Sequence, residues 1–102
     1  MLELRPTCEH CNKALPPHAT DARICSYECT FCAQCVDNVL GNVCPNCGGG
    51  FVPRPVRPSS RWKGDNYLGH DPASTMERHR GVDAQAHAQF AAPIRGIAPE
   101  RR

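Results

Sequence analysis

Cysteine is the residue type whose number and spacing in this sequence point most directly to chemistry. The chain of 102 residues contains eight cysteines, all between positions 8 and 47. They fall into four pairs, and two or three residues separate the members of each pair. That spacing lets one turn of the chain direct both sulfur atoms at a single metal ion. The pairs are Cys8 with Cys11, Cys25 with Cys29, Cys32 with Cys35, and Cys44 with Cys47.

Four such pairs are enough for two tetrahedral sites with four thiolate ligands each. We therefore predict two bound Zn²⁺ ions, with iron as an alternative because a four-thiolate site holds it in the same geometry. Disulfides are the competing use of cysteine, and they belong to oxidising compartments. The start MLELRPTCEH carries Glu3 and Arg5 where a secretory signal needs an apolar run. We expect a cytoplasmic chain with reduced cysteines, and no stretch is apolar enough to predict a membrane span.

Residues beside the cysteines favour their ionised form. Asn12 and Gly48 each follow a pair, and both residue types tolerate the left-handed backbone that lets main-chain amides point at sulfur. Pro45 sets a turn inside the last pair. Cys32 and Cys35 come at the start of a predicted helix, where the amides and the helix dipole favour negative charge.

The central stretch ICSYECTFCAQC, residues 24–35, allows other interpretations. Its CxxxCxxC spacing matches the cluster motif of radical S-adenosylmethionine enzymes, but those need a barrel of roughly two hundred residues, which this chain cannot supply. A single iron–sulfur site within residues 25–35 would leave the other two pairs for a separate ion. His10 lies inside the first pair, yet the cysteines already fill two sites, so we expect His10 to face solvent. We expect surface positions for the other histidines, which are His18, His70, His79 and His87.

The elements that must position these pairs are short. The i, i+3, i+4, i+7 spacing of Val36, Val39, Leu40 and Val43 predicts one helical face, and Gly41 predicts the end of that helix. We expect this face to complete one thin core, which a domain this small must supplement with metal. The other expected core residues are Leu2, Leu4, Leu15, Ile24 and Phe31.

Composition divides the chain after the last cysteine. We predict a two-zinc module over residues 1–52, and a basic, Pro-rich linker with a mostly disordered tail over residues 53–102. A weak helix is expected around residues 74–90. Three Lys or Arg face five acids in residues 1–50, whereas nine face five acids in residues 51–102. Affinity for nucleic acid should therefore reside in the tail, where a basic run contains Arg54, Arg57, Arg61 and Lys63.

The cysteine spacing and the stretch TFCAQCVDNVLGNVCPNC resemble the RING-type cross-brace over residues 8–47. Phe31 precedes the fifth cysteine, a predicted helix follows the sixth, and Pro45 lies between the last two. The resemblance implies a small metal-stabilised α+β module with zinc knuckles of the treble-clef kind and one short helix. It also implies that alternate pairs share an ion, so that one site is Cys8, Cys11, Cys32 and Cys35, and the other is Cys25, Cys29, Cys44 and Cys47.

Two departures from the RING pattern leave the pairing open: the usual histidine is absent, and three residues separate Cys25 from Cys29. A sequential pairing, in which Cys8 and Cys11 join Cys25 and Cys29, is the alternative. The segments MLELRPTCEHC, RICSYECTFCAQC and VCPNCGG also resemble the short bacterial cysteine-rich family known as domain of unknown function 1272, over about residues 1–55. This second resemblance implies no established activity.

We predict a structural zinc-binding module that mediates protein–protein interaction and is not an enzyme, because closed four-thiolate sites leave no open coordination position. The alternative is a nucleic-acid-binding zinc protein that uses the basic tail, where Trp62 offers stacking. A RING-type ubiquitin-ligase-like activity has less support. The positions that would recruit a conjugating enzyme hold Glu9, the small aliphatic residues around Val39, and Gly48.

Overall fold

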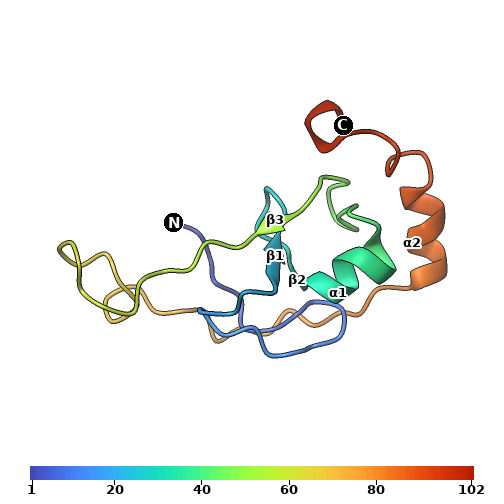
Figure 1. Cartoon of the computed structure of the whole chain (residues 1–102). Helices are drawn as coiled ribbons and strands as arrows, with labels where there is room; N and C mark the ends of the chain where they lie inside the picture. Colours follow the sequence, from blue (N-terminus) through green and yellow to red (C-terminus); the bar gives the residue numbers. More distant parts are fainter.

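Three short antiparallel strands lie at the centre of the structure, which is a computed structural model that describes residues 1–102. β1 (Ala22–Ile24) and β2 (Thr30–Cys32) form a hairpin in which Arg23 lies opposite Phe31. β3 (Val52–Pro53) pairs with the other edge of β1, so the strand order is β2-β1-β3 (Figure 1). The architecture is therefore a small α+β fold built around a minimal sheet.

One short helix follows β2 without a connecting loop. α1 (Ala33–Cys35) continues as a π-helical turn, η1 (Val36–Leu40). Gly41 ends it in the left-handed conformation, with a φ of 60°, as the sequence predicts for a glycine at a helix C-terminus. Val36 and Leu40 face the interior, so the apolar spacing of this stretch marks its buried face.

The core is small and rich in cysteine. Six of the eleven residues in the main buried cluster are cysteines. Of the core residues expected from sequence, Leu2 and Val39 are half-buried, and the others are buried: Leu4, Leu15, Ile24, Phe31, Val36, Leu40 and Val43. Because the sulfur atoms make up so much of this interior, its stability depends on what the sulfur atoms bind.

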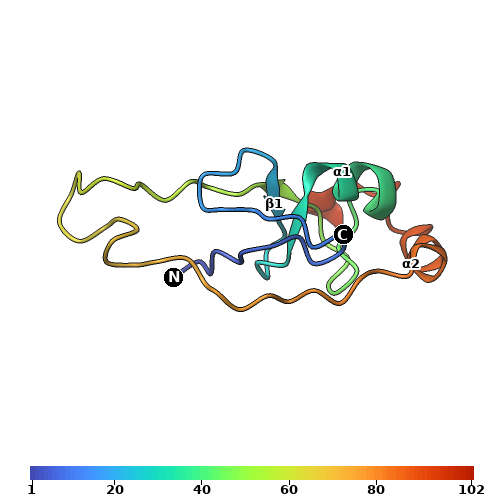
Figure 2. The same cartoon turned by 90° about the horizontal axis from the view of Figure 1, so that it is seen from below.

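The chain beyond β3 contains one regular α-helix, α2 (Ala84–Ala91), and a final 3₁₀ turn, η2 (Pro99–Arg101). Between β3 and α2 the chain leaves the module as a loop over residues 58–71 and returns along it, as Figures 1 and 2 show. The molecule is accordingly elongated, with extents of 46 × 27 × 18 Å. Asp83 caps α2, since its side chain accepts hydrogen bonds from the amides of Gln85 and Ala86.

The tail differs from the disorder expected for residues 53–102. Its returning stretch hydrogen-bonds to the module, for example from the Ser74 amide to the Leu4 carbonyl at 3.0 Å. Within the range 74–90 expected to favour helix, only residues from Ala84 onward are helical, and Gly81 adopts a φ of 67° just before them. Main-chain hydrogen bonds and a few side chains, among them Arg57 and Val82, fix this course, and the composition of the tail does not predict these contacts. None of the helices has the length and apolar character needed to cross a membrane.

Candidate metal centres

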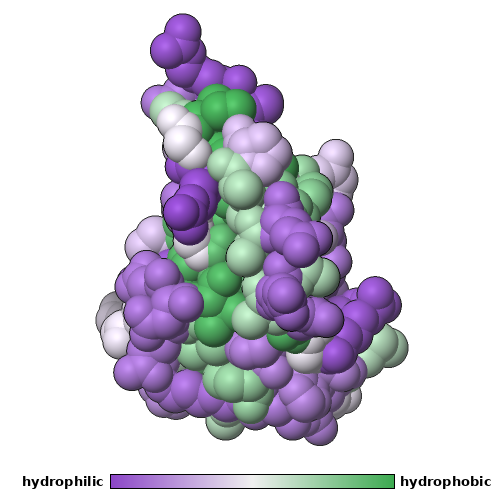
Figure 3. Space-filling model, turned by 90° about the vertical axis from the view of Figure 1, so that its right-hand side faces the viewer, coloured by the Kyte–Doolittle hydropathy of each residue, from purple (hydrophilic) through white to green (hydrophobic).

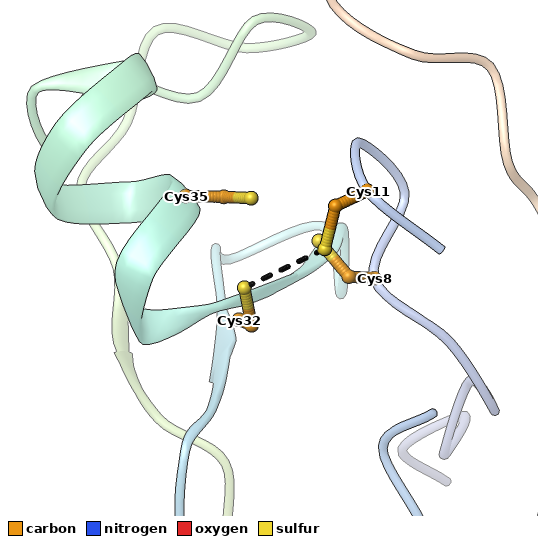
Figure 4. Close-up of side chains that lie close together, drawn as sticks. All are labelled: Cys8, Cys11, Cys32 and Cys35. Atoms are coloured by element: carbon orange, nitrogen blue, oxygen red, sulfur yellow. Dashed lines mark hydrogen bonds between the residues drawn. The ribbon is translucent and has the colours of Figure 1, made fainter. Parts of the chain in front are cut away.

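The first cysteine cluster joins the first and third pairs of the sequence. Cys8 and Cys11 lie on the N-terminal turn, Cys32 ends β2, and Cys35 lies in α1. All four sulfur atoms lie within 4.8 Å of one another, and Figure 4 shows the two pairs facing each other. The direct passage from β2 into α1 therefore places the third pair opposite the first.

The sulfur spacing of this cluster fits a tetrahedral zinc ion. Zn–S bonds of ~2.3 Å at tetrahedral angles place neighbouring sulfur atoms about 3.8 Å apart. The Sγ atoms of Cys11 and Cys32 are 3.8 Å apart, which is the dashed contact in Figure 4. Four thiolates with no carboxylate or imidazole in the group form a donor set typical of closed structural sites.

Main-chain hydrogen bonds shape the turn that carries the first pair. The Cys8 amide donates to the Lys13 carbonyl, and the Asn12 amide donates to the Cys8 carbonyl, both at 2.9 Å. Asn12 has a φ of 61°, the left-handed conformation that its residue type predicts. These hydrogen bonds and the left-handed Asn12 define the turn that brings Cys8 and Cys11 together.

The second cluster joins the second and fourth pairs. The sulfur atoms of Cys25, Cys44 and Cys47 lie within 4.8 Å of one another. Cys29 lies outside this 4.8 Å group, but its sulfur is close enough to those of Cys44 and Cys25 for their charges to interact. The same sulfur accepts a hydrogen bond from Asn46 Nδ2 at 3.4 Å. All four sulfur atoms thus gather around Cys44, which is fully buried.

Main-chain amides point at sulfur in this cluster, as the sequence predicts for the CPNCGG turn. The Gly49 amide donates to Cys47 Sγ at 3.4 Å, and Gly48 before it has a φ of 78°. The Tyr27 amide donates to Cys25 Sγ at 3.3 Å. Such donors stabilise sulfur in its thiolate form.

The two clusters interleave along the chain. The first pair meets the third, and the second meets the fourth, which is the alternation that the RING resemblance implies and not the sequential grouping. The four cysteines of residues 25–35 are divided between the two clusters rather than gathered in one. All eight cysteines are free of disulfide bonds.

Burial and mutual contact shift the pKa values of these thiols in opposite directions. Burial raises the pKa of Cys8, and it raises that of Cys25 to about 11. A hydrogen bond from Cys44 lowers the pKa of Cys29 to about 5, and the same contact raises the pKa of Cys44. Buried thiols such as Cys25 therefore stay protonated at neutral pH unless a cation compensates their charge, and a divalent metal ion supplies that compensation.

Glu9 has a structural role that its sequence position did not predict. Its side chain is almost buried, and its carboxylate accepts a hydrogen bond from the Thr30 amide and pairs with Arg5 at 3.0 Å. It therefore ties the first turn to β2. Because Glu9 follows Cys8 directly, this bond also fixes the orientation of the first cluster.

His87 corrects the expectation that the histidines are surface residues. This residue is 5% exposed, and its Nε2 atom donates to the Leu40 carbonyl at 2.9 Å. His10 is half-buried, and its Nδ1 atom accepts a hydrogen bond from the Val82 amide at 2.9 Å. No histidine belongs to either cysteine cluster.

The basic run is less free than the sequence predicts. Arg54 is 4% exposed, and its guanidinium donates three hydrogen bonds to main-chain carbonyls, those of Arg5, Leu15 and Pro16. Arg57 donates to the carbonyls of Leu2 and Asp71. Arg61 and Lys63 are exposed, so two of the four cations face solvent. No feature of the sequence distinguishes the buried arginines from the exposed ones.

Comparison with known proteins matches the N-terminal part of the chain. The model of a family described as "Protein of unknown function (DUF1272)" matches residues 1–57. An uncharacterised protein of Rhizobium meliloti (strain 1021) is 60% identical over 63 residues, which are 62% of this chain and 75% of that protein. No solved structure matches the chain.

Proposed function

The chain belongs to the DUF1272 family of proteins of unknown function, and we propose that it is a zinc-stabilised module that binds a protein partner. The gathering of eight cysteines into two interleaved clusters carries this proposal. One Zn²⁺ ion would be held by Cys8, Cys11, Cys32 and Cys35, and the other by Cys25, Cys29, Cys44 and Cys47.

The order of elements around the clusters supports a RING-like arrangement of the treble-clef kind. A turn with two cysteines is followed by the hairpin of β1 and β2 and then by α1, and the third pair lies where β2 passes into α1. The second cluster closes the other end of the module through the CPNCGG turn. Iron in the same four-sulfur geometry is the alternative cofactor, and the measurement below distinguishes the two metals.

A structural rather than catalytic role is favoured by the donor sets. Four sulfur ligands leave no coordination position for water or substrate. Structural zinc supplies roughly 10 to 16 kcal/mol of apparent binding free energy per site, which compensates for a core of this size. The proposal therefore assigns no enzyme activity to the module. It places the chain in a reducing compartment such as the cytoplasm, because thiolate ligands require reduced cysteines.

Exposed apolar side chains near the clusters support a protein partner. Tyr27 is 72% exposed and borders a shallow hollow with Asn46 and Cys47 beside the second cluster. Figure 3 shows a second apolar region, a green band on the face of the molecule that carries α2. Phe90 in α2 and Ile97 after it are exposed apolar residues of this part of the chain. Apolar surface bordered by hydrophilic side chains is typical of protein-binding faces.

Ubiquitin-ligase-like activity has weaker support at the three positions that would recruit a conjugating enzyme. Glu9 is nearly buried and engaged with Arg5. Val39 packs against the core, and the tail lies over Gly48, where Ile94 and Phe90 approach. None of the three is presented to solvent as a contact residue.

Nucleic-acid binding is the second candidate, and one observation favours it. Trp62 is 81% exposed on the projecting loop, between the exposed Arg61 and Lys63. A cation beside an open indole suits a single-stranded nucleic acid. Binding of single-stranded nucleic acid that weakens with salt and is lost in Trp62→Ala would support this candidate. Met76→Ala, at another exposed apolar residue, serves as the control.

Native mass spectrometry of the full chain tests the leading proposal. We expect two metal ions per chain, and the mass of each ion distinguishes zinc from iron. Removal of the ions with a strong chelator should collapse the NMR dispersion of residues 1–50, and added zinc should restore it. A metal-free chain that kept its dispersed spectrum would contradict a metal-stabilised fold.

A further inference from the structure

The returning tail occupies one face of the cysteine module through main-chain hydrogen bonds. The amides of Arg80 and Gly81 both donate to the Glu9 carbonyl, at 3.2 and 3.1 Å. The next amide, that of Val82, donates to His10 Nδ1 at 2.9 Å. Three consecutive amides of the tail are thus satisfied by two adjacent residues of the first cysteine turn, as when an edge of the backbone captures an extended peptide.

Two side chains of the tail anchor it beyond these amides. Val82 packs against the cysteine-rich core cluster. His87, in the first turns of α2, reaches the last residue of η1 and donates from Nε2 to the Leu40 carbonyl while almost fully buried. That carbonyl lies at the C-terminal end of its helix, where acceptors lack helical partners.

The tail also covers the turn of the last cysteine pair. A Cβ atom at Gly48 would lie 3.7 Å from Ile94 Cδ1 and 3.8 Å from Phe90 Cζ, so both side chains rest on this glycine. Phe90 is tilted against the ring of His87 at a centroid distance of 6.0 Å. One segment therefore spans both cysteine turns and the helix end between them.

The tail contacts the module through a few anchoring residues and is not closely packed against it along its whole length. A cavity of about 320 Å³ lies between the two partners, bordered on the module side by Phe31 and Pro45 and on the tail side by Asp83 and Phe90. This pocket is open to solvent, so the two surfaces do not touch there and gain no dispersion energy from each other. The tail can therefore leave the module at a lower free-energy cost than a segment that is closely packed along its whole length.

We propose that this face of the module is a peptide-binding groove and that residues 79–90 are its built-in ligand, which a protein partner displaces. The partner is a peptide with the same features as the tail. It supplies three consecutive free amides, the last of them on an aliphatic anchor residue, then an Asp-capped helix that presents a histidine and, three residues later, an aromatic ring. The inference deepens the proposed function and depends on it, because the two cysteine turns form the groove.

Because the tail is covalently connected to the module, it competes with any free peptide for the groove. A ligand tethered to its own site acts at an effective concentration on the order of millimolar. A free peptide of the same sequence must therefore bind the intact chain far more weakly than a chain whose tail has been disabled. That difference is measurable without knowing the natural partner.

The test uses full-length chains and a fluorescein-labelled synthetic peptide of residues 76–95. The release variant carries Val82→Asp and His87→Ala, and the matched control carries Gln85→Ala and Gln89→Ala on the exposed side of α2. Fluorescence anisotropy should show the peptide binding the release variant at least about tenfold more tightly than the wild type or the control. The same peptide with both anchor substitutions should not bind.

Hydrogen exchange provides the second measurement. The amides of Arg80, Gly81 and Val82 should be protected in the wild type and exposed in the release variant, and the same three amides of the peptide should become protected when it binds that variant. A release variant that holds two metal ions but fails to bind the peptide overturns the groove. Peptide binding to a chain that holds no metal would instead support the groove and contradict the zinc proposal, so the two failures are distinguishable.

Discussion

At the scale of single residues, one buried arginine holds the start of the tail against the module. Arg54 connects the start of the tail to three carbonyls of the N-terminal segment, across 38 to 49 residues of sequence. Burial lowers the pKa of its guanidinium, yet such a group stays charged at any pH a protein encounters. Its charge is therefore compensated by the three carbonyl dipoles and by the negative charge of Asp21.

Substitution of Arg54 should destabilise the folded chain. Arg54→Ala leaves three carbonyls without their donor, and charge-assisted hydrogen bonds of this kind lead us to expect a loss of roughly 3 kcal/mol of unfolding free energy. Denaturant unfolding at saturating zinc measures this loss of unfolding free energy. The control Arg101→Ala, at an exposed side chain, should change little. Equal effects of the two substitutions would show that the buried contacts do not matter.

Pairs of cysteine substitutions should reveal how the ligands are shared. Cys8→Ser with Cys32→Ser removes ligands from one interleaved site, so we expect native mass spectrometry to find one remaining ion. Cys8→Ser with Cys25→Ser damages both sites and should leave none. A sequential pairing predicts the reverse result for the two double variants, which makes each the control for the other.

At the scale of elements, the boundary of the short helix depends on one glycine. Gly41 ends η1 with a φ of 60°, and the carbonyl of the preceding Leu40 receives the tail histidine. Gly41 thus has two effects. It ends the helix, and it leaves the Leu40 carbonyl in a position to accept the hydrogen bond from His87. A side chain at position 41 would disturb both.

We expect Gly41→Ala to lower the unfolding free energy by about 1 to 2 kcal/mol, the cost of the left-handed conformation for a residue with a Cβ atom. Gly41→Asn should cost less, because asparagine tolerates that conformation. Gly96→Ala is the control, since a Cβ atom there meets nothing within 4 Å. Thermal unfolding measures all three, and a neutral Gly41→Ala would contradict this role for the glycine.

The elements also show which features the sequence could predict. The cysteine turns, the end of the helix at Gly41 and the buried valine and leucine face all follow from spacing over a few residues. The docking of Arg54 and His87 does not, because each binds a main-chain carbonyl far away in sequence. Every residue has a main-chain carbonyl, so the residue types in the sequence do not indicate which carbonyl will accept such a hydrogen bond.

At the scale of the whole molecule, metal binding couples stability to pH. Thiolates that hold an ion bind fewer protons than the thiols of the unfolded chain, whose pKa is about 8.5. Stability of the metal-bound chain therefore rises with pH and falls on acidification. Without metal the sign differs for Cys25: its pKa of about 11 lies above the unfolded value, so its contribution is complete below about pH 8.5 and is lost as the pH rises toward 11.

We therefore expect the thermal unfolding midpoint of the metal-bound chain to drop steadily from about pH 8 to about pH 5, with loss of ions in step. Calorimetry and native mass spectrometry over this range measure the two quantities. Cys29 without metal would also lose stability as the pH falls toward 5, because its folded-state pKa of about 5 lies below the unfolded value. The loss of ions in step with the midpoint is therefore the specific sign of metal ligation, and a flat profile would contradict it.

The alternation of cysteine pairs has a consequence for assembly. Binding of an ion by Cys8, Cys11, Cys32 and Cys35 closes a loop that contains Cys25 and Cys29. The chain has then already lost the conformational entropy of that closure when Cys25 and Cys29 come together with Cys44 and Cys47. The first ion should thus promote uptake of the second, and the chain should pass between empty and doubly loaded forms with little of the singly loaded one.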